Sequence, residues 1–187
     1  MMQVSKSILI NCITGGMTTE DIAFNRVLVP HVKANYQSAE ENGFKRVFDE
    51  NEYSNFSYVF HQNGMWRDEE DLQYEIVAMR MKKWGIKNPL ALNSMASLAN
   101  TYSYQGKYEE AEELDLKILD LCKTMLGPEH PDTLTSLANL ARTYSDQGKY
   151  EKAEELELKV LDLHKRVLGQ YLTLPGIFHV DSIWNGV

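Results

Sequence analysis

Apolar residues recur three and four positions apart along one stretch of the chain, and the same pattern returns further on. The first stripe consists of Leu92, Met95, Leu98, Ala99 and Tyr102, and the second consists of Leu134, Leu137, Leu140, Ala141 and Tyr144. Residues at this spacing lie on one face of a helix. Each stripe therefore predicts a helix with one buried side, and we expect Ala99 and Ala141 to lie where two helices approach closely.

A tight turn and a second helix follow each of these predicted helices. Both turns read "QGK", and Gly106 and Gly148 within them can adopt the left-handed conformation that ends a helix at little steric cost. After the first turn comes another apolar stripe, formed by Ala111, Leu114, Ile118, Leu121, Cys122 and Met125. Gly127 ends this helix, so each unit is predicted to be a helix, a turn, a helix and a short loop.

The two units are copies of each other at an offset of 42 residues, and they agree at 22 of 30 positions between Leu98–Gly127 and Leu140–Gly169. A fainter copy ends at Gly85, with Trp66 in the place of Tyr108. A fixed period of this length indicates stacked helix pairs with an atypical terminal repeat. We therefore divide the chain into an N-terminal helical cap or linker (1–48), three repeats (49–85, 86–127 and 128–169) and an irregular tail (170–187).

Both ends of such an array need a cover. The N-terminal segment has an apolar side, kinked or interrupted by Pro30, that could cover the first repeat; it consists of Ile22, Phe24, Val27, Leu28, Val32 and Tyr36. On the last helix we expect an open apolar face formed by Leu156, Val160, Leu163 and Val167. An uncovered apolar end favours association. We therefore expect either that the tail packs on the third repeat or that the chain self-associates there; an altered gene end is the alternative origin of the tail.

The segments "LARTYSDQGKYEKAEELELKVLDLHKRVLG" and "LGPEHPDTLTSLANLA" closely resemble tetratricopeptide repeats of the 42-residue kinesin-light-chain type. The family's packing positions are matched by Leu98, Ala99, Tyr102 and Ala111, and again by Leu140, Ala141, Tyr144 and Ala153. Asp115 and Glu157 depart from the family, because an aromatic residue often packs there, and neighbouring leucines such as Leu114 and Leu116 are expected to compensate. The resemblance implies an all-α, right-handed superhelix of antiparallel helix pairs, with the first helix of each pair on the concave side.

A second resemblance suggests an alternative function. The segment "RVLVPHVKANYQSAEENG", residues 26–43, is similar to the part that precedes such repeats in fungal NOD-like (STAND) proteins. Those proteins carry a nucleotide-binding domain upstream, which this sequence lacks. The alternative is therefore a sensor or repeat fragment of a STAND-type NTPase.

Composition and charge narrow the function classes. The net charge is −8 and no cluster of Lys and Arg stands out, which argues against nucleic-acid binding. No apolar stretch is long enough to cross a bilayer, so we expect no membrane partner. Cys12 and Cys122 are the only cysteines, and we interpret both as reduced thiols of a cytoplasmic protein.

The sequence contains no recognisable catalytic or metal-binding motif. The phosphate-loop pattern GxxxxGK[ST] is absent, and both Gly-Lys pairs fall in turns between helices. The five histidines lack metal-ligand spacing, and His130 is expected to be a loop or capping residue. We interpret the acidic run "EEAEEL" as a solvated helix face with pairs such as Glu113 with Lys117 and Glu155 with Lys159. The chain is therefore predicted to be a non-enzyme that uses no cofactor and no metal.

The predicted functional surface is a row beside the buried stripe on the first helix of each pair. Its members are Asn93, Ala96, Asn100, Ser103 and Tyr104 in one repeat, and Thr135, Ala138, Asn139, Arg142, Ser145 and Asp146 in the next. Amides can both donate to and accept from a peptide backbone, and an arginine can bind a carboxylate with two hydrogen bonds. We therefore predict a peptide-binding groove formed by Asn93, Asn100, Ser103, Tyr104, Asn139 and Arg142, with Glu113 and Glu155 away from it. A merely solvated helix face is the alternative.

Overall fold

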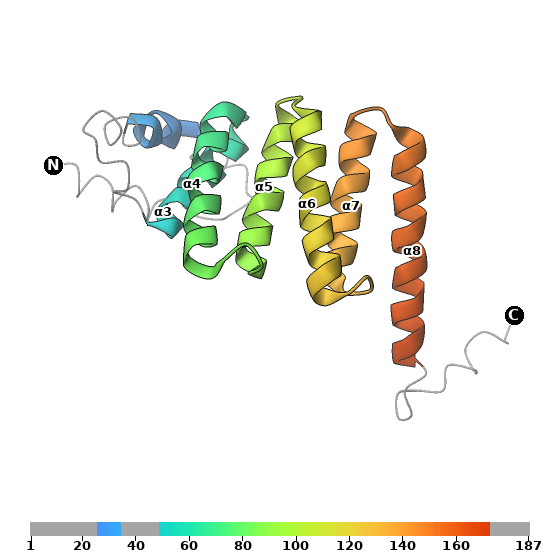
Figure 1. The fold of residues 1–187 in the computed structure, drawn as a ribbon. Helices are drawn as coiled ribbons and strands as arrows, with labels where there is room; N and C mark the ends of the chain where they lie inside the picture. Colours follow the sequence, from blue (N-terminus) through green and yellow to red (C-terminus); the bar gives the residue numbers. More distant parts are fainter. Residues whose placement is uncertain (1–25, 35–48, 173–187) are drawn as a thin grey trace, which may run out of the picture. The chain divides into compact units, whose positions relative to one another are not determined.

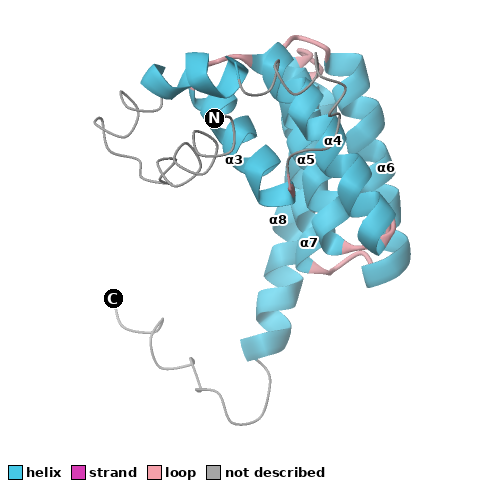
Figure 2. Ribbon diagram, turned by 90° about the vertical axis from the view of Figure 1, so that its left-hand side faces the viewer, coloured by secondary structure: helices cyan, strands magenta, loops and turns pink. Residues whose placement is uncertain are grey.

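Every regular element in the described part of the chain is an α-helix. The computed structural model describes residues 26–34 and 49–172 (Figure 1). Besides a helix at 26–34, it contains α3 (Glu50–Gln62), α4 (Trp66–Trp84), α5 (Pro89–Tyr104), α6 (Tyr108–Leu126), α7 (Pro131–Asp146) and α8 (Tyr150–Leu172). Figure 2 shows helices joined by short loops, and these residues include no strand. The predicted all-α class is confirmed.

Local signals in the sequence explain where the helices begin and end. Asn88 caps α5 by accepting a hydrogen bond from the Leu90 backbone N–H over 2.9 Å, and Pro89 occupies the first turn, where no N–H is needed. His130 caps α7 in the same way, as expected of a loop or capping residue. Gly106 and Gly148 have φ angles of 75° in the two "QGK" turns, so the predicted left-handed turns are confirmed.

The chain forms two compact units that divide between Ala111 and Glu112, inside α6. In the first unit, α4 lies between α3 and α5. One core of this unit is formed by Leu28 and Val32 of the helix at 26–34, Tyr53, Phe56, Val59 and Phe60 of α3, and Leu72 and Ile76 of α4. The helix at 26–34 therefore packs on the first helix pair.

The N-terminal apolar stripe is correct only in part. Leu28 and Val32 are buried, but Val27 is 64% exposed, so its assignment to the apolar side was wrong. The helix is also continuous through Pro30, where we expected a kink or an interruption. The other predicted members, Ile22, Phe24 and Tyr36, lie outside the described residues.

In the second unit, α7 packs against both α6 and α8. Its core is formed by Leu119 of α6, by Leu134, Leu137 and Leu140 of α7, and by Leu163 of α8, with Tyr144, Leu156 and Val160 partly buried around it. Ala99 and Ala141 are both 1% exposed, so each is buried as predicted.

The open apolar face of α8 consists of other residues than the sequence indicated. Leu163 is 4% exposed inside the core, and Leu156 and Val160 pack against the same core. Among the leucines of α8 whose exposure is described, Leu158 and Leu161 are exposed, at 59% and 50%. The assignment of Leu163 to the open face was wrong, because α7 covers the side of α8 that carries it, whereas Leu156, Val160 and Val167 are half-buried.

Candidate functional site

A groove between α7 and α8 brings part of the predicted row together. Its volume is about 340 Å³, and its lining consists of Ala138, Arg142 and Ser145 from α7, and Glu157, Val160, Leu161 and His164 from α8. Arg142 and Glu157 place opposite charges on its two walls, and Leu161 adds an exposed apolar surface. Three members of the row predicted on this helix therefore line one groove. Asn139 is half-buried and lies outside that lining.

The predicted row on α5 has a different environment. Asn93 is exposed, whereas Asn100 is half-buried. The Ser103 hydroxyl oxygen is buried and has no hydrogen-bond partner among the described residues. Since α5 lies in the first unit and α7 in the second, a groove shared by Asn100, Asn139 and Arg142 stays a prediction.

Tyr104 belongs to a trio of aromatic rings. Its ring stacks on Trp66, with the centroids 4.5 Å apart and an interplanar angle of 14°. The His61 ring meets both at their edges, 5.3 Å from Trp66 and 5.4 Å from Tyr104. Tyr104 is nevertheless 54% exposed, so one side of its ring is accessible. Sequence reasoning missed this trio, although Trp66 was visible in the fainter copy as the aromatic residue in the place of Tyr108.

A hollow of about 900 Å³ adjoins this trio. It is lined by Trp66 and Tyr104, by the acidic residues Asp68, Glu70 and Asp71, and by Gly64, Met65, Arg67, Gln105 and Lys107. The acidic side chains are already engaged in part, because Asp68 pairs with Lys33 over 2.8 Å and Glu70 pairs with Lys107 over 2.7 Å. Two of the three acidic side chains that line the hollow are therefore already paired with lysines.

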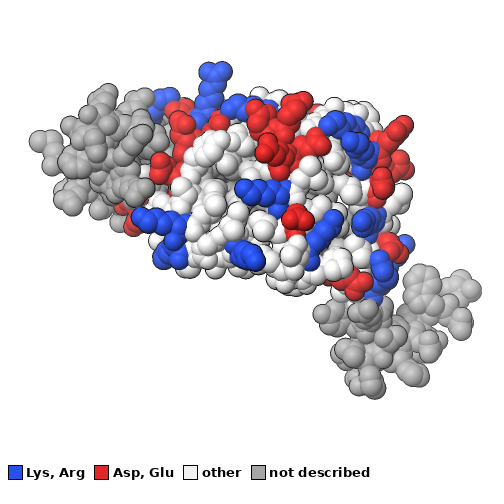
Figure 3. Space-filling model, in the orientation of Figure 1, with Lys and Arg blue, Asp and Glu red and all other residues white. Residues whose placement is uncertain are grey.

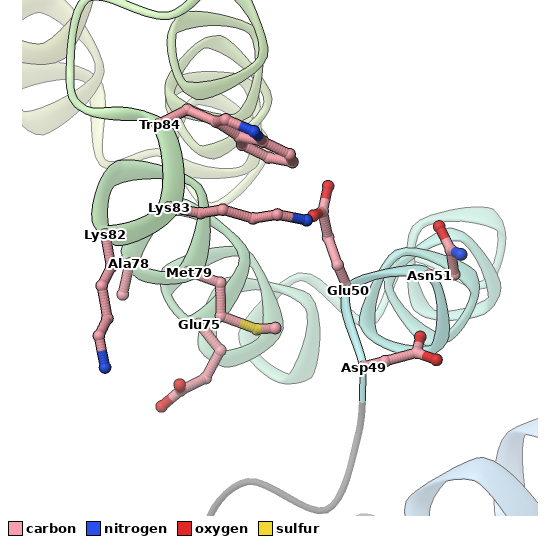
Figure 4. Close-up of a pocket in the computed structure, with 9 residues that line it drawn as sticks. All are labelled: Asp49, Glu50, Asn51, Glu75, Ala78, Met79, Lys82, Lys83 and Trp84. Carbon is pink, nitrogen blue, oxygen red and sulfur yellow. The ribbon is translucent and has the colours of Figure 1, made fainter.

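The other large hollow of the first unit lies between the start of α3 and the end of α4 (Figure 4). Its volume is about 870 Å³, and its lining is Asp49, Glu50, Asn51, Glu75, Ala78, Met79, Lys82, Lys83 and Trp84. The Lys83 ammonium group lies 4.3 Å from the Trp84 ring centroid. Acidic side chains (Asp49, Glu50 and Glu75) and basic side chains (Lys82 and Lys83) both line it, and Figure 3 likewise shows both signs of charge side by side on one face.

The two "QGK" turns make the same contact, which we call the latch: a glutamine and a lysine of the turn both bind one glutamate of the preceding second helix. Gln105 and Lys107 donate to Glu70 Oε2 over 2.8 and 2.7 Å. The same contact recurs 42 residues later. Gln147 and Lys149 donate to Glu112 Oε2 over 2.9 and 2.8 Å.

The latch changes the interpretation of the acidic run "EEAEEL". Glu113 is exposed, as expected of a solvated helix face, but its neighbour Glu112 is half-buried and bound by the turn. The hydrogen bond from Lys149 is the main reason why the pKa of Glu112 is lowered. The Gly-Lys pairs therefore lie in turns between helices, and their lysines join one helix pair to its neighbour.

Two buried acids were not predicted. Asp115 is 3% exposed and accepts a hydrogen bond from Thr143 Oγ1 over 2.7 Å. Burial raises the pKa of Asp115, and the Thr143 hydrogen bond and the Arg142 charge oppose this only in part. Neighbouring leucines were expected to compensate here; Leu114 is half-buried but Leu116 is 44% exposed, and the side chain buried at this position is Asp115 itself.

The second buried acid is Glu69. Both of its carboxylate oxygens lie near His61 Nδ1, at 3.1 and 3.2 Å, and burial raises the pKa of Glu69. His61, Gln73 and Thr101 all interact with this carboxyl group. No cluster of three His, Cys, Asp or Glu side chains suited to a metal ion occurs within residues 26–34 and 49–172. Nor is any described helix both long and apolar enough to cross a membrane.

Comparison with known proteins identifies the fold. Residues 90–166 match the family model described as tetratricopeptide repeat. A solved structure from Podosopora anserina, named as a putative kinesin light chain with nearly identical TPR-like repeats, is 22% identical to this chain. It has a TM-score of 0.61 and covers 89% of this chain and 86% of the other. Its Q17M variant has a TM-score of 0.62, with coverages of 90% and 87%.

A third structure extends the comparison. BtubC (BKLC) from P. vanneervenii is 19% identical, with a TM-score of 0.54, and the match covers 90% of this chain and 59% of BtubC. The search of curated proteins found no match. At these identities the structures show the fold alone, and that fold is the predicted array of tetratricopeptide-like helix pairs.

Proposed function

Because residues 90–166 are tetratricopeptide repeats, a fold that commonly mediates protein–protein interaction, we propose that this chain is a protein- and peptide-binding scaffold. The observation that supports the proposal best is the groove on α7 and α8. There Ala138, Arg142 and Ser145, all from the row beside the buried stripe, meet the exposed Leu161. An open groove that combines the cation of Arg142 with the apolar side chains Ala138, Val160 and Leu161 suits a peptide more than it suits catalysis.

The proposed binding surface is the row on the first helices: Asn93, Asn100, Ser103, Tyr104, Asn139 and Arg142. Arg142 would bind a carboxylate of the ligand, because its guanidinium group can donate two parallel hydrogen bonds. Asn100 and Asn139 would pair with the ligand backbone. Tyr104 would offer the exposed side of its ring, whose other contacts are with Trp66 and His61.

The scaffold needs no cofactor and no metal, and its proposed setting is the cytoplasm. Nucleic acid and membranes are not among the proposed partners. Self-association through the C-terminal end stays a prediction.

Selection from a displayed peptide library tests the proposal, because it requires no identified ligand. Peptides enriched on the intact chain should lose about tenfold or more in affinity for Asn100→Ala plus Arg142→Ala, since both changes remove donors from the row. The matched control is Glu113→Ala plus Glu155→Ala, which removes two exposed side chains of the second helices. Equal losses with both pairs, or no loss with the first, would show that the ligand binds elsewhere.

The alternative function, a repeat fragment of a STAND-type NTPase, shares one prediction with the scaffold proposal. In that case a longer protein would supply the nucleotide-binding domain, and these repeats would recognise a signal. Isothermal titration with ATP and GTP should therefore give no binding to this chain. Saturable binding of either nucleotide would contradict both the scaffold proposal and the fragment hypothesis.

A further inference from the structure

One exposed side of α8 corresponds in sequence to a side of α6 that α7 buries. Asp115, Leu119 and Cys122 of α6 are at most 5% exposed. Their counterparts 42 residues later are Glu157, Leu161 and His164, and all three are exposed. Nearly the same surface is thus buried on one second helix and open on the other. We call Glu154, Glu157, Leu161 and His164 the α8 face.

The contacts that α7 makes with α6 show which partner side chains suit a surface of this kind. Thr143 of α7 donates to Asp115, and Ser136 Oγ lies 3.4 Å from Cys122 Sγ. Leucines of α7 pack against Leu119. The turn that follows α7 closes the latch on Glu112 through Gln147 and Lys149. Glu154, the counterpart of Glu112, is exposed.

We propose that the α8 face docks a helix hairpin of the same design, supplied by another polypeptide. The partner helix carries leucines for Leu161 and a hydroxyl side chain for Glu157, and its turn carries a glutamine and a lysine for Glu154. This inference rests on the proposed function, because the partner is a protein and the α8 face borders the same groove.

The tail of this chain lacks the lysine that the latch on the α8 face requires. Residues 173–187 contain neither lysine nor arginine, so they cannot supply the lysine of a latch, and His179 is their one side chain that can become cationic. A partner with a basic turn is therefore complementary to Glu154, and the tail is not.

The first helix pair of a second copy of the chain also lacks the hydroxyl side chain, the glutamine and the lysine that the α8 face requires. In the first helix pair, α3 and the following turn carry Val59, Asn63 and Met65 where α7 and its turn carry Thr143, Gln147 and Lys149. Val59 is fully buried in the core that contains Leu28 and Val32. The turns that do carry lysine are already closed on Glu70 and Glu112.

The probe for this inference is a synthetic peptide with the sequence of residues 129–150, which comprises α7 and its turn. A covalent bridge between positions 138 and 142 holds it helical, because these positions line the groove away from the buried leucines. Fluorescence anisotropy measures its binding to the full chain. We expect saturable binding that weakens about fivefold with Glu154→Lys in the chain, and about tenfold with Leu161→Asp.

A charge exchange provides the decisive comparison. The peptide carrying Lys149→Glu should bind the natural chain weakly and regain affinity for the Glu154→Lys chain. Glu155→Lys, the same charge change on the neighbouring exposed residue, should leave affinity within about twofold. Absence of saturable binding, equal effects of the changes at 154 and 155, or failure of the exchange to restore affinity would each overturn the inference.

Two further results would overturn the choice of partner. Light scattering that shows a dimer of the natural chain, abolished by Leu161→Asp, would identify a second copy as the occupant. A more than tenfold gain in peptide affinity on deletion of 173–187 would identify the tail. The proposed function stands independently of these results if Asn93→Ala plus Asn100→Ala weakens the library-selected peptides.

Discussion

Replacing Thr143 by valine should lower the free energy of unfolding far more than the small change in shape suggests. Thr143 and Asp115 share a 2.7 Å hydrogen bond, and their exposed fractions are 1% and 3%. Valine has nearly the shape of threonine but cannot donate, so the variant leaves a carboxyl group buried without its donor. Losing the partner of a buried polar group costs about 1–3 kcal/mol, and we expect a loss in this range. Urea denaturation followed by circular dichroism measures it.

Thr135 provides the matched control on the same helix. Its side chain is exposed, so Thr135→Val should change the free energy of unfolding by about 0.5 kcal/mol or less. Combining Thr143→Val with Asp115→Leu removes both buried polar groups and should recover most of the loss. The explanation fails if Thr143→Val is no more destabilising than Thr135→Val, or if the double variant is as unstable as the single one.

The pH dependence of stability tests the same pair independently. Because burial raises the pKa of Asp115, the folded chain keeps this proton to a higher pH than the unfolded chain. The stabilising contribution of this group is thus fully present below its unfolded pKa of about 4 and is lost as pH rises through the folded pKa. Asp115→Asn keeps an acceptor for Thr143 but cannot ionise. Its stability relative to the natural chain should therefore increase from about pH 4 to about pH 7, and a constant difference would argue against burial as the cause.

Much of the fold could be predicted because its signals are local. The period of 42 residues, the glycines of the turns and Pro131 in the first turn of α7 are all visible without the structure. The orientation of α8 could not be predicted in the same way. An apolar pattern shows that a helix has a buried side, but the position of the neighbouring helix decides which leucines lie there. Leu163 is therefore buried and Leu161 exposed, although both are leucines of one helix.

The candidate site was less predictable because its contacts join residues far apart in the sequence. Glu112 meets Gln147 and Lys149, which lie 35 and 37 residues later. No periodicity within a single helix connects these positions. Asp115 was visible as a departure from the repeat pattern, but its partner Thr143 lies 28 residues away. Helical spacing alone predicted the row on α7, of which Ala138, Arg142 and Ser145 line one groove while Asn139 lies outside its lining.

Three further substitutions test the packing and the latch. Ala141→Leu should overpack the helix interface and cost about 1–3 kcal/mol, and an unchanged melting curve would show that the alanine has free space. Val32→Ala should cost about 1–3 kcal/mol because Val32 is fully buried. The control Val27→Ala changes an exposed side chain and should cost about 0.5 kcal/mol or less. Equal urea midpoints of the two variants would mean that the helix at 26–34 does not pack on α3 and α4 in solution. Glu112→Lys opposes the Lys149 charge and removes the acceptor of the latch, so it should destabilise the chain by about 1 kcal/mol, less at high salt. Glu113→Lys makes the same charge change on an exposed neighbour and should be nearly neutral. If the two variants have the same urea midpoint at low salt, the latch contributes nothing to stability. The partner turn proposed for Glu154 was inferred from the latch on Glu112, so that inference would then lack support.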